Sequence, residues 1–261
     1  MDLALSGRLA VVTGGSKGIG LAVTRALVAE GVRVVTGSRS ISPELRELES
    51  SGSVHPVAVD LAGPEGPAAL VAHAERLGGV DLLVNNAGAV TPRPGGFLSV
   101  DDAGWQATLE LGLLATVRAI RAVLPGMLRR DGGDVVTIAS VNAVLPDPDV
   151  IDYSVAKAAL RNLSKGLSNE FADRGVRFNT ISPGPVATDL WLGDHGVAAA
   201  RSAASGRPAA EFAADAAAAA GTGRFTRPDE VAALVLMLAS DSTANVTGVD
   251  LTIDGGLLRT I

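Results

Sequence analysis

The stretch TGGSKGIG, residues 13–20, carries the strongest single indication of the fold. It follows the apolar run Leu9–Thr13 and leads into an Ala- and Leu-rich segment with helical periodicity, residues 20–30. Glycines allow a tight turn and a close approach of the backbone to a ligand. The amino end of a helix adds free N–H groups and the positive end of the helix dipole. A strand, a glycine-rich turn and a helix in this order are typical of a site for a dinucleotide pyrophosphate.

The rest of the chain alternates between short apolar runs and longer helical segments. We expect further strands at Val32–Thr36, Val54–Val59, Leu82–Val84, Val135–Ile138, Val176–Ile181 and Val249–Ile253, and helices at Gly20–Glu30, Pro67–Leu77, Asp102–Arg130, Ser154–Asp173 and Pro228–Ala239. Strands without polar alternation are covered on both faces, as in a parallel sheet. The pattern therefore predicts a single-domain α/β fold, a doubly wound parallel sheet of seven strands with helices on both faces.

Composition narrows the class of protein. The 261 residues carry a formal net charge of −6, no cysteine and three scattered histidines. A thiolate metal site is excluded, and we expect no metal. Without clustered Lys and Arg, a nucleic-acid partner is not expected. The amino-terminal residues lack a signal-peptide pattern and no apolar run reaches the length of a membrane span, so we expect a cytoplasmic protein with no membrane partner.

The segment from about residue 188 to 226 interrupts the alternation. It is rich in Ala and shows no strand pattern. Two interpretations are compatible here: short surface helices, or a substrate lid, since insertions at the carboxyl edge of such a sheet often cover a site.

The choice of dinucleotide depends on the end of the second strand. An acidic residue there binds the ribose 2′-hydroxyl of NAD. This chain has Ser38-Arg39 instead, with Lys17 in the glycine loop. Two cations favour a 2′-phosphate, so we expect NADP(H) rather than NAD(H).

Tyr153 and Lys157 are four residues apart, which places both side chains on one face of a helix. A nearby ammonium lowers the pKa of a phenol, and a tyrosine so placed can exchange a proton with a carbonyl or alcohol oxygen. Ser140, at the end of the fifth strand, can hydrogen-bond the same substrate oxygen. The expected catalytic residues are Ser140, Tyr153 and Lys157.

Together these segments resemble the short-chain dehydrogenase/reductase family over essentially the whole chain. The matching segments are 13–20, Asp60-Leu61, 85–88 (NNAG), Ser140, Tyr153 with Lys157, 179–188 (NTISPGPVAT) and 254–256 (DGG). The resemblance implies a Rossmann fold and a cofactor site made of Gly14, Ser16, Lys17, Gly18, Ile19, Gly20, Ser38, Arg39, Asp60, Leu61, Asn86, Ala87, Gly88, Tyr153, Lys157, Pro183, Gly184, Val186 and Thr188.

One position departs from the family pattern. Seven residues after Trp105, where the family carries an asparagine that holds a water in the proton relay to the lysine, this chain has Gly112. Either a kink at the glycine lets its backbone carbonyl take that role, or the relay is weak. Glu110 should point to another face.

Family resemblance also implies a homotetramer, or a homodimer, built on the long helix Asp102–Arg130, which has apolar residues on more than one face. We expect the substrate to be an apolar ketone or secondary alcohol, open-chain or cyclic, rather than a strongly anionic compound. It would bind above Ser140 and Tyr153 against Val141, Leu145, Trp191 and Leu192. The sequence thus predicts an NADP(H)-dependent oxidoreductase. The alternatives are an NAD-dependent alcohol dehydrogenase and a cofactor-binding sensor with weak catalysis.

Overall fold

The computed structural model describes residues 3–259, which form one seven-stranded parallel sheet in the order β3-β2-β1-β4-β5-β6-β7. The strands are β1 (Leu9–Thr13), β2 (Arg33–Ser38), β3 (Val54–Ala58), β4 (Leu82–Asn85), β5 (Gly133–Ile138), β6 (Val176–Pro183) and β7 (Asp250–Ile253). This confirms the predicted doubly wound α/β fold, the Rossmann type, in a single domain.

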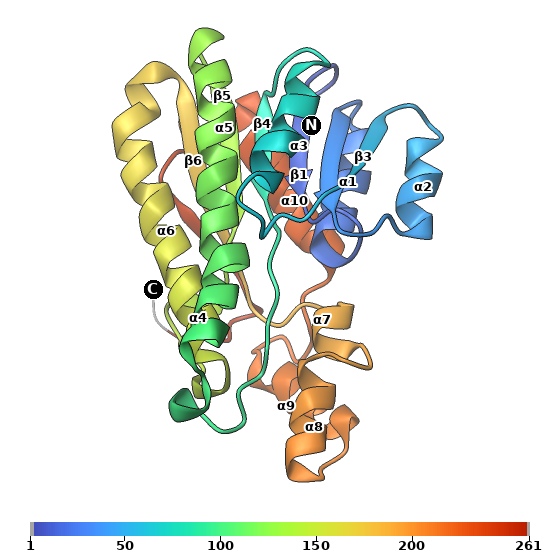
Figure 1. The fold of residues 1–261 in the computed structure, drawn as a ribbon, viewed down its shortest axis with the longest axis vertical. Coiled ribbons are helices and arrows are strands. Elements are labelled where there is room, and N and C mark those ends of the chain that lie inside the picture. Colours follow the sequence, from blue (N-terminus) through green and yellow to red (C-terminus); the bar gives the residue numbers. More distant parts are fainter. Residues whose placement is uncertain (1–2, 260–261) are drawn as a thin grey trace.

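Helices cover both faces of the sheet (Figure 1). They are α1 (Gly18–Ala29), α2 (Pro43–Glu49), α3 (Gly66–Glu75), α4 (Asp102–Leu109), α5 (Ala115–Arg129), α6 (Ile151–Phe171), α7 (Asp189–Leu192), α8 (Val197–Ser205), α9 (Ala209–Ala219) and α10 (Pro228–Ala239). Helices α1 and α10 contribute to the hydrophobic core on one face, and α3, α5 and α6 to the core on the other.

Strand β1 shows why the predicted strands lack polar alternation. Its Ala10 and Val12 belong to the core under α1 and α10, whereas Leu9 and Val11 belong to the core under α3 and α5. All four side chains are buried. Because successive side chains of a strand point to opposite faces, a strand covered on both faces is apolar at every position.

The strand order reverses between β1 and β4. Loops leaving the carboxyl ends of these neighbouring strands turn to opposite faces of the sheet, and the crevice between them is where ligands bind in open α/β folds. The fold therefore places residues 14–17 and 86–88, which follow β1 and β4, beside that crevice.

The long helix expected at Asp102–Arg130 is not uniform. Helices α4 and α5 are joined by a π-helical turn at Glu110–Leu114, with Gly112 at its centre and buried. Such turns are rare, cause kinks and occur often at functional sites. The structure thus shows an irregularity at the glycine that departs from the family pattern.

The same stretch, Asp102–Arg129, is the one described segment long and apolar enough to cross a membrane by length and composition alone. Its most apolar window has a mean hydropathy of 1.5 and is 44% buried within the chain. Core helices pass the same test, and the α5 part contributes Val123 and Met127 to the core under the sheet.

Between β6 and α10 the chain forms the three helices α7, α8 and α9, which lie below the carboxyl ends of the strands in Figure 1. Both ends of this insertion are held together. Ala187 N donates to Thr226 O at 2.9 Å, and Thr226 N donates to Pro185 O at 3.0 Å. The helices therefore project from a closed base.

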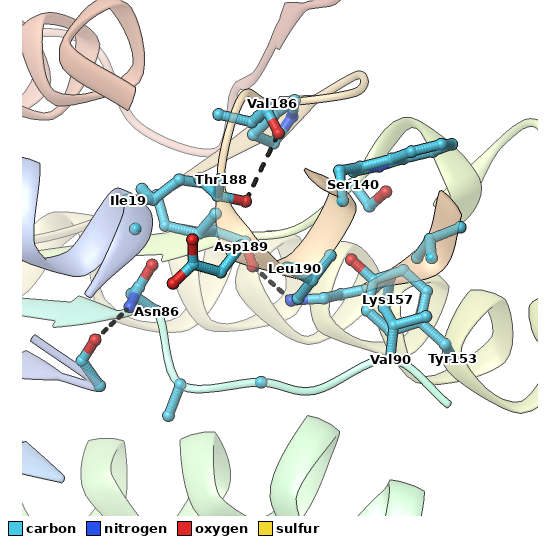
Figure 2. A pocket seen from close by; sticks show the side chains of 18 of the residues that line it. Ile19, Asn86, Val90, Ser140, Tyr153, Lys157, Val186, Thr188, Asp189 and Leu190 are labelled. Atoms are coloured by element: carbon cyan, nitrogen blue, oxygen red, sulfur yellow. Dashed lines mark hydrogen bonds between the residues drawn. The ribbon is translucent and has the colours of Figure 1, made fainter. Parts of the chain in front are cut away.

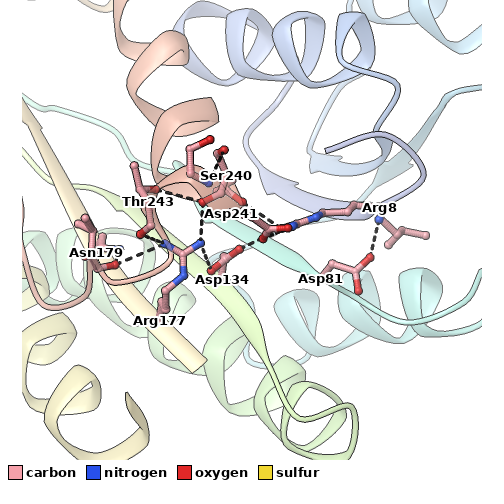
Figure 3. A network of polar contacts seen from close by, with 12 residues as sticks. Arg8, Asp81, Asp134, Arg177, Asn179, Ser240, Asp241 and Thr243 are labelled. Atoms are coloured by element: carbon pink, nitrogen blue, oxygen red, sulfur yellow. Dashed lines mark hydrogen bonds and ion pairs between the residues drawn. The ribbon is translucent and has the colours of Figure 1, made fainter. Parts of the chain in front are cut away.

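Ion pairs connect the amino ends of three strands, at the end of the sheet opposite the loops that follow the strands (Figure 3). Asp134, at the start of β5, lies 2.8 Å from Arg177 Nη2 and 3.3 Å from Arg8 Nη1, and Arg8 also binds Asp241. Burial raises the pKa of Asp134 to about 6, although both guanidinium groups act in the opposite direction. This cluster joins β1, β5 and β6 to the end of α10, far from the loops that follow the strands.

Candidate active site

The glycine loop between β1 and α1 has the geometry of an anion site. Gly14 and Gly18 have φ of +73° and +56°, values that favour glycine. A Cβ atom on Gly20 would lie 2.2 Å from Gly14 O, so this glycine permits the close packing of the turn. Helix α1 has no side-chain cap, which leaves its first N–H groups pointing out of the turn.

Thr13 and Asn86 hold this loop against the end of β4. Thr13 Oγ1 accepts from the backbone N–H of Asn86 at 2.9 Å and of Ala87 at 3.0 Å. Asn86 Nδ2 donates to Thr13 O at 3.0 Å and Gly14 O at 3.1 Å. Asn86 is therefore a brace of the turn, and Ala87 and Gly88 beside it line the same cavity.

Two cations lie near the end of β2: Arg39 directly follows the strand, and Lys17 belongs to the neighbouring glycine loop. Arg39 and Lys17 are exposed, line the cavity and make no ion pair within residues 3–259. Ser38 is buried, and its hydroxyl donates to Ser40 O at 2.8 Å. Asp60, at the next strand end, accepts from Ala62 N at 3.0 Å. The two free cations are suited to binding a phosphate dianion.

Ser140, Tyr153 and Lys157 meet on the other side of the cavity (Figure 2). Ser140 caps a short 3₁₀ turn just after β5, two residues beyond the strand end, and its Oγ accepts from Asn142 N at 3.1 Å. Tyr153 lies in the first turn of α6, which begins at Ile151 rather than Ser154. Lys157 is buried and donates to Ile138 O at 2.7 Å.

The pKa of Tyr153 beside Lys157 differs from the sequence-based expectation of a lowered value. Burial raises the pKa of Tyr153, and the hydrogen bond with Ser140 only partly offsets this. Lys157 Nζ lies 5.5 Å from the centre of the Tyr153 ring, and burial lowers the pKa of this ammonium to about 8. In the protein alone Tyr153 is therefore protonated at neutral pH, ready to act as an acid.

Asp152, directly before Tyr153, was not found by sequence reasoning. Its buried carboxylate accepts from Arg93 Nη2 and Thr108 Oγ1, both at 2.7 Å, and from Tyr153 N at 3.1 Å. Burial acts to raise the pKa of Asp152, but these hydrogen bonds hold it below its ordinary value. The contacts fasten the first turn of α6 to α4 and to the loop after β4. Neither Asp152 nor Arg93 belongs to a sequence pattern that would have predicted this contact.

One cavity of about 1110 Å³ collects nearly all of the predicted site residues. Two of them, Gly20 and Leu192, do not line it. Gly20 packs inside the turn, and Leu192 is half exposed at the end of α7. Of the residues predicted to contact the substrate, Val141, Leu145 and Trp191 line the cavity. Residues that sequence reasoning missed include Val90 and Leu111, whereas Leu190, Val197 and Arg201 belong to the predicted lid segment.

Gly112 faces the helix that carries Tyr153 and Lys157. A Cβ atom at this position would lie 3.3 Å from Ala156 Cβ, and Ala156 lies between the two catalytic candidates in α6. Glu110 points elsewhere, as expected, because its carboxylate binds Arg118 at 2.7 Å. The site thus has a helical irregularity, but no side chain, at the position of the family asparagine.

Comparison with known proteins identifies the class. A family model described as enoyl-(acyl carrier protein) reductase matches residues 14–258. The chain is 32% identical to the human dehydrogenase/reductase SDR family member 4 over 97% of its own length and 88% of the relative. The fold and site are those of an oxidoreductase acting on CH–OH and C=O groups with a nucleotide cofactor. The chain belongs to the short-chain dehydrogenase/reductase family.

Other relatives act on small polyols and sugars. D-threitol dehydrogenase of Mycolicibacterium smegmatis is 35% identical, with 98% of this chain and 94% of the relative covered. The structure of L-sorbose reductase from Gluconobacter frateurii, in complex with NADPH and L-sorbose, is 36% identical and has a TM-score of 0.91 with all of both chains covered.

Proposed function

We propose that this protein is an NADP(H)-dependent oxidoreductase that transfers a hydride between the nicotinamide and a ketone or secondary alcohol, with Tyr153 as the acid/base. The observation that carries this proposal is the meeting of Ser140, Tyr153 and Lys157 in the same cavity as the glycine loop. The cofactor supplies the hydride when bound, and the protein orients the reactants and moves the proton.

Each side chain of the trio has a separate role. In the reductive direction the protonated Tyr153 donates to the carbonyl oxygen, and Ser140 hydrogen-bonds that same oxygen. Lys157, buried and held by Ile138 O, fixes the positive charge beneath the tyrosine ring. It would also bind the nicotinamide ribose. The other cofactor contacts would come from the glycine loop, Asp60, Leu61, residues 86–88 and residues 183–188.

The preference for NADP(H) is supported by the free cations Arg39 and Lys17 and by the NADPH bound to L-sorbose reductase. The test is kcat/KM for NADPH and NADH at one ketone concentration. We expect a higher kcat/KM for NADPH than for NADH. Arg39→Ala should lower kcat/KM for NADPH by about tenfold, because a charge-assisted contact to the 2′-phosphate is lost, and should leave kcat/KM for NADH unchanged.

Arg33→Ala is the matched control, because Arg33 lies at the amino end of the same strand and binds Leu77 O instead. It should leave the ratio between the two cofactors unchanged. A wild-type enzyme that prefers NADH would contradict the assignment and favour an NAD-dependent alcohol dehydrogenase.

Residues 188–226 act as a substrate lid in this proposal. Their ends are paired at Val186 and Thr226, and α7, α8 and α9 contribute Trp191, Val197 and Ala216 to the cavity. A segment anchored at its base can open and close as a unit.

The assembly proposed is a homotetramer, or a homodimer, in the cytoplasm. Its support is the helix pair α4–α5, whose most apolar window is less than half buried within one chain although its mean hydropathy is 1.5. The apolar side chains that one chain buries only in part, such as Leu109, Leu113 and Val117, are suited to packing on a second copy of the helix pair.

A further inference from the structure

An arginine of α8 reaches across the cavity that contains Tyr153. Arg201 Nη2 lies 2.6 Å from Asp147 Oδ2 and 3.2 Å from Asp149 Oδ2, both in the loop between β5 and α6. Its guanidinium also lies 5.9 Å from the centre of the Trp191 ring. Arg201, Asp147 and Trp191 all line the cavity, so this contact joins the insertion 188–226 to the substrate wall.

The guanidinium has donors to spare. Both ion pairs use the same nitrogen, Nη2. Arg201 Nε is buried and has no hydrogen-bond partner within the described part of the chain, and no partner there is found for Nη1. Arginine carries five N–H donors, and an unmade hydrogen bond on a buried donor costs free energy. A ligand oxygen that reaches Nη1 from the cavity would therefore be bound favourably.

The charges around Arg201 determine which kind of ligand oxygen can bind to its guanidinium. Two carboxylates face one guanidinium, which leaves the cluster with an excess negative charge. A phosphate or carboxylate would be repelled by Asp147 and Asp149. A hydroxyl group fits both partners, because it accepts from the guanidinium and donates to a carboxylate. The side chains of Asp147 and Asp149 are 35% and 44% exposed, which places the cluster at the solvent side of the cavity.

We propose that Arg201, with Asp147 and Asp149, is a specificity determinant that binds a hydroxyl group of the substrate away from the reacting carbon, so that the substrate is an uncharged, polyhydroxylated ketone or the corresponding alcohol. This rests on the proposed function, and it adds a polar group beside the apolar side chains of Val141, Leu145 and Leu190, which line the same cavity.

The test compares two ketones of equal length, L-sorbose and 2-hexanone, with NADPH. Arg201→Gln should lower kcat/KM for L-sorbose relative to 2-hexanone by about tenfold, as expected for loss of a hydrogen bond to a charged group. The effect should appear mainly in KM. The open-chain fraction of the sugar is the same for every variant, so it cancels from the ratio.

Arg207→Gln is the matched control. Arg207 also pairs with two carboxylates, Glu211 and Asp215, and lies over an aromatic ring, Phe212, but it does not line the cavity. Its substitution should leave the substrate ratio unchanged. If Arg201→Gln lowers kcat/KM for both ketones equally, or for neither, Arg201 only fastens the insertion and the proposal is overturned.

A second arm tests the charge argument. Asp147→Asn combined with Asp149→Asn should raise kcat/KM for the anion 4-oxopentanoate relative to 2-pentanone. If this ratio does not rise, the charge argument is contradicted.

Calorimetric titration of sorbitol into the complex of the protein with NADPH distinguishes this proposal from the proposed function, because sorbitol and NADPH cannot react with each other. Sorbitol binding that is weakened in Arg201→Gln supports the proposal even if no ketone is reduced. Reduction of 2-hexanone by a wild-type protein that does not bind sorbitol overturns it while the proposed function stands.

Discussion

Tyr153 shows at the scale of one residue how placement changes an expected property. The spacing to Lys157 predicted a tyrosine with a lowered pKa, yet burial raises that pKa and Ser140 supplies the main opposing contact. Spacing along a helix fixes which face two side chains share, but not whether the ammonium meets the hydroxyl or the ring. Here Lys157 lies against the ring and binds Ile138 O, because β5 ends beside α6. The spacing therefore located the pair correctly but not its electrostatics.

The substitution of Gly112 gives a second prediction for a single residue. Gly112→Asn should leave the protein folded and should not lower kcat, because the helix is already irregular there and the amide would restore the side chain that the family pattern carries. Ala156 Cβ is 3.3 Å from the modified position, so α6 must shift by a few tenths of an ångström. Gly112→Ala adds the same Cβ without the amide and is the control. A large fall in kcat in both folded variants would show that the glycine itself is required.

The helices and strands that contribute to the core along their length were predicted well from the sequence. Strand β1 and helix α10 have the predicted bounds, Leu9–Thr13 and Pro228–Ala239. Their apolar side chains pack on neighbours along their whole length, so the pattern ends where the element ends. The strand β6 runs two residues past the prediction to Pro183, where the polar Ser182 is buried by a hydrogen bond to Asp250.

Elements that depend on tertiary contacts were missed. Helix α2 is short, and Leu45 is its one buried residue, so seven residues give no clear periodicity. The interaction of Arg201 with Asp147 joins residues 54 positions apart, and the carboxylate of Asp152 is satisfied by Arg93, 59 positions away. Such contacts follow from how the elements pack, which no local pattern records.

For the whole molecule, the ion cluster of Asp134 makes stability depend on pH. The pKa of Asp134 in the folded protein is about 6, against about 3.9 for an unfolded chain. A carboxyl with a raised pKa contributes most to stability below pH 4, and this contribution is lost as the pH rises through 6. The free energy of unfolding of the wild type should therefore fall by about 2 kcal/mol relative to Asp134→Asn between about pH 4.5 and 7.5.

Urea unfolding of the two proteins at both pH values measures this difference, and other titrating groups cancel from the comparison. Arg177 keeps its contact with Thr243 O, and Arg8 keeps Asp241, so the variant should fold. A difference that does not change with pH, or that favours the wild type as the pH rises, would contradict the raised pKa.

The measurement that tests the central claim most directly is NADPH oxidation against a panel of uncharged ketones, with Tyr153→Phe as the paired variant. We predict turnover of at least one ketone by the wild type. Loss of the proton donor should lower kcat in Tyr153→Phe by on the order of a hundredfold or more, while NADPH binding is retained. NADPH binding without turnover of any ketone, or equal kcat in the two proteins, would contradict the assignment of Tyr153 as the acid of this site.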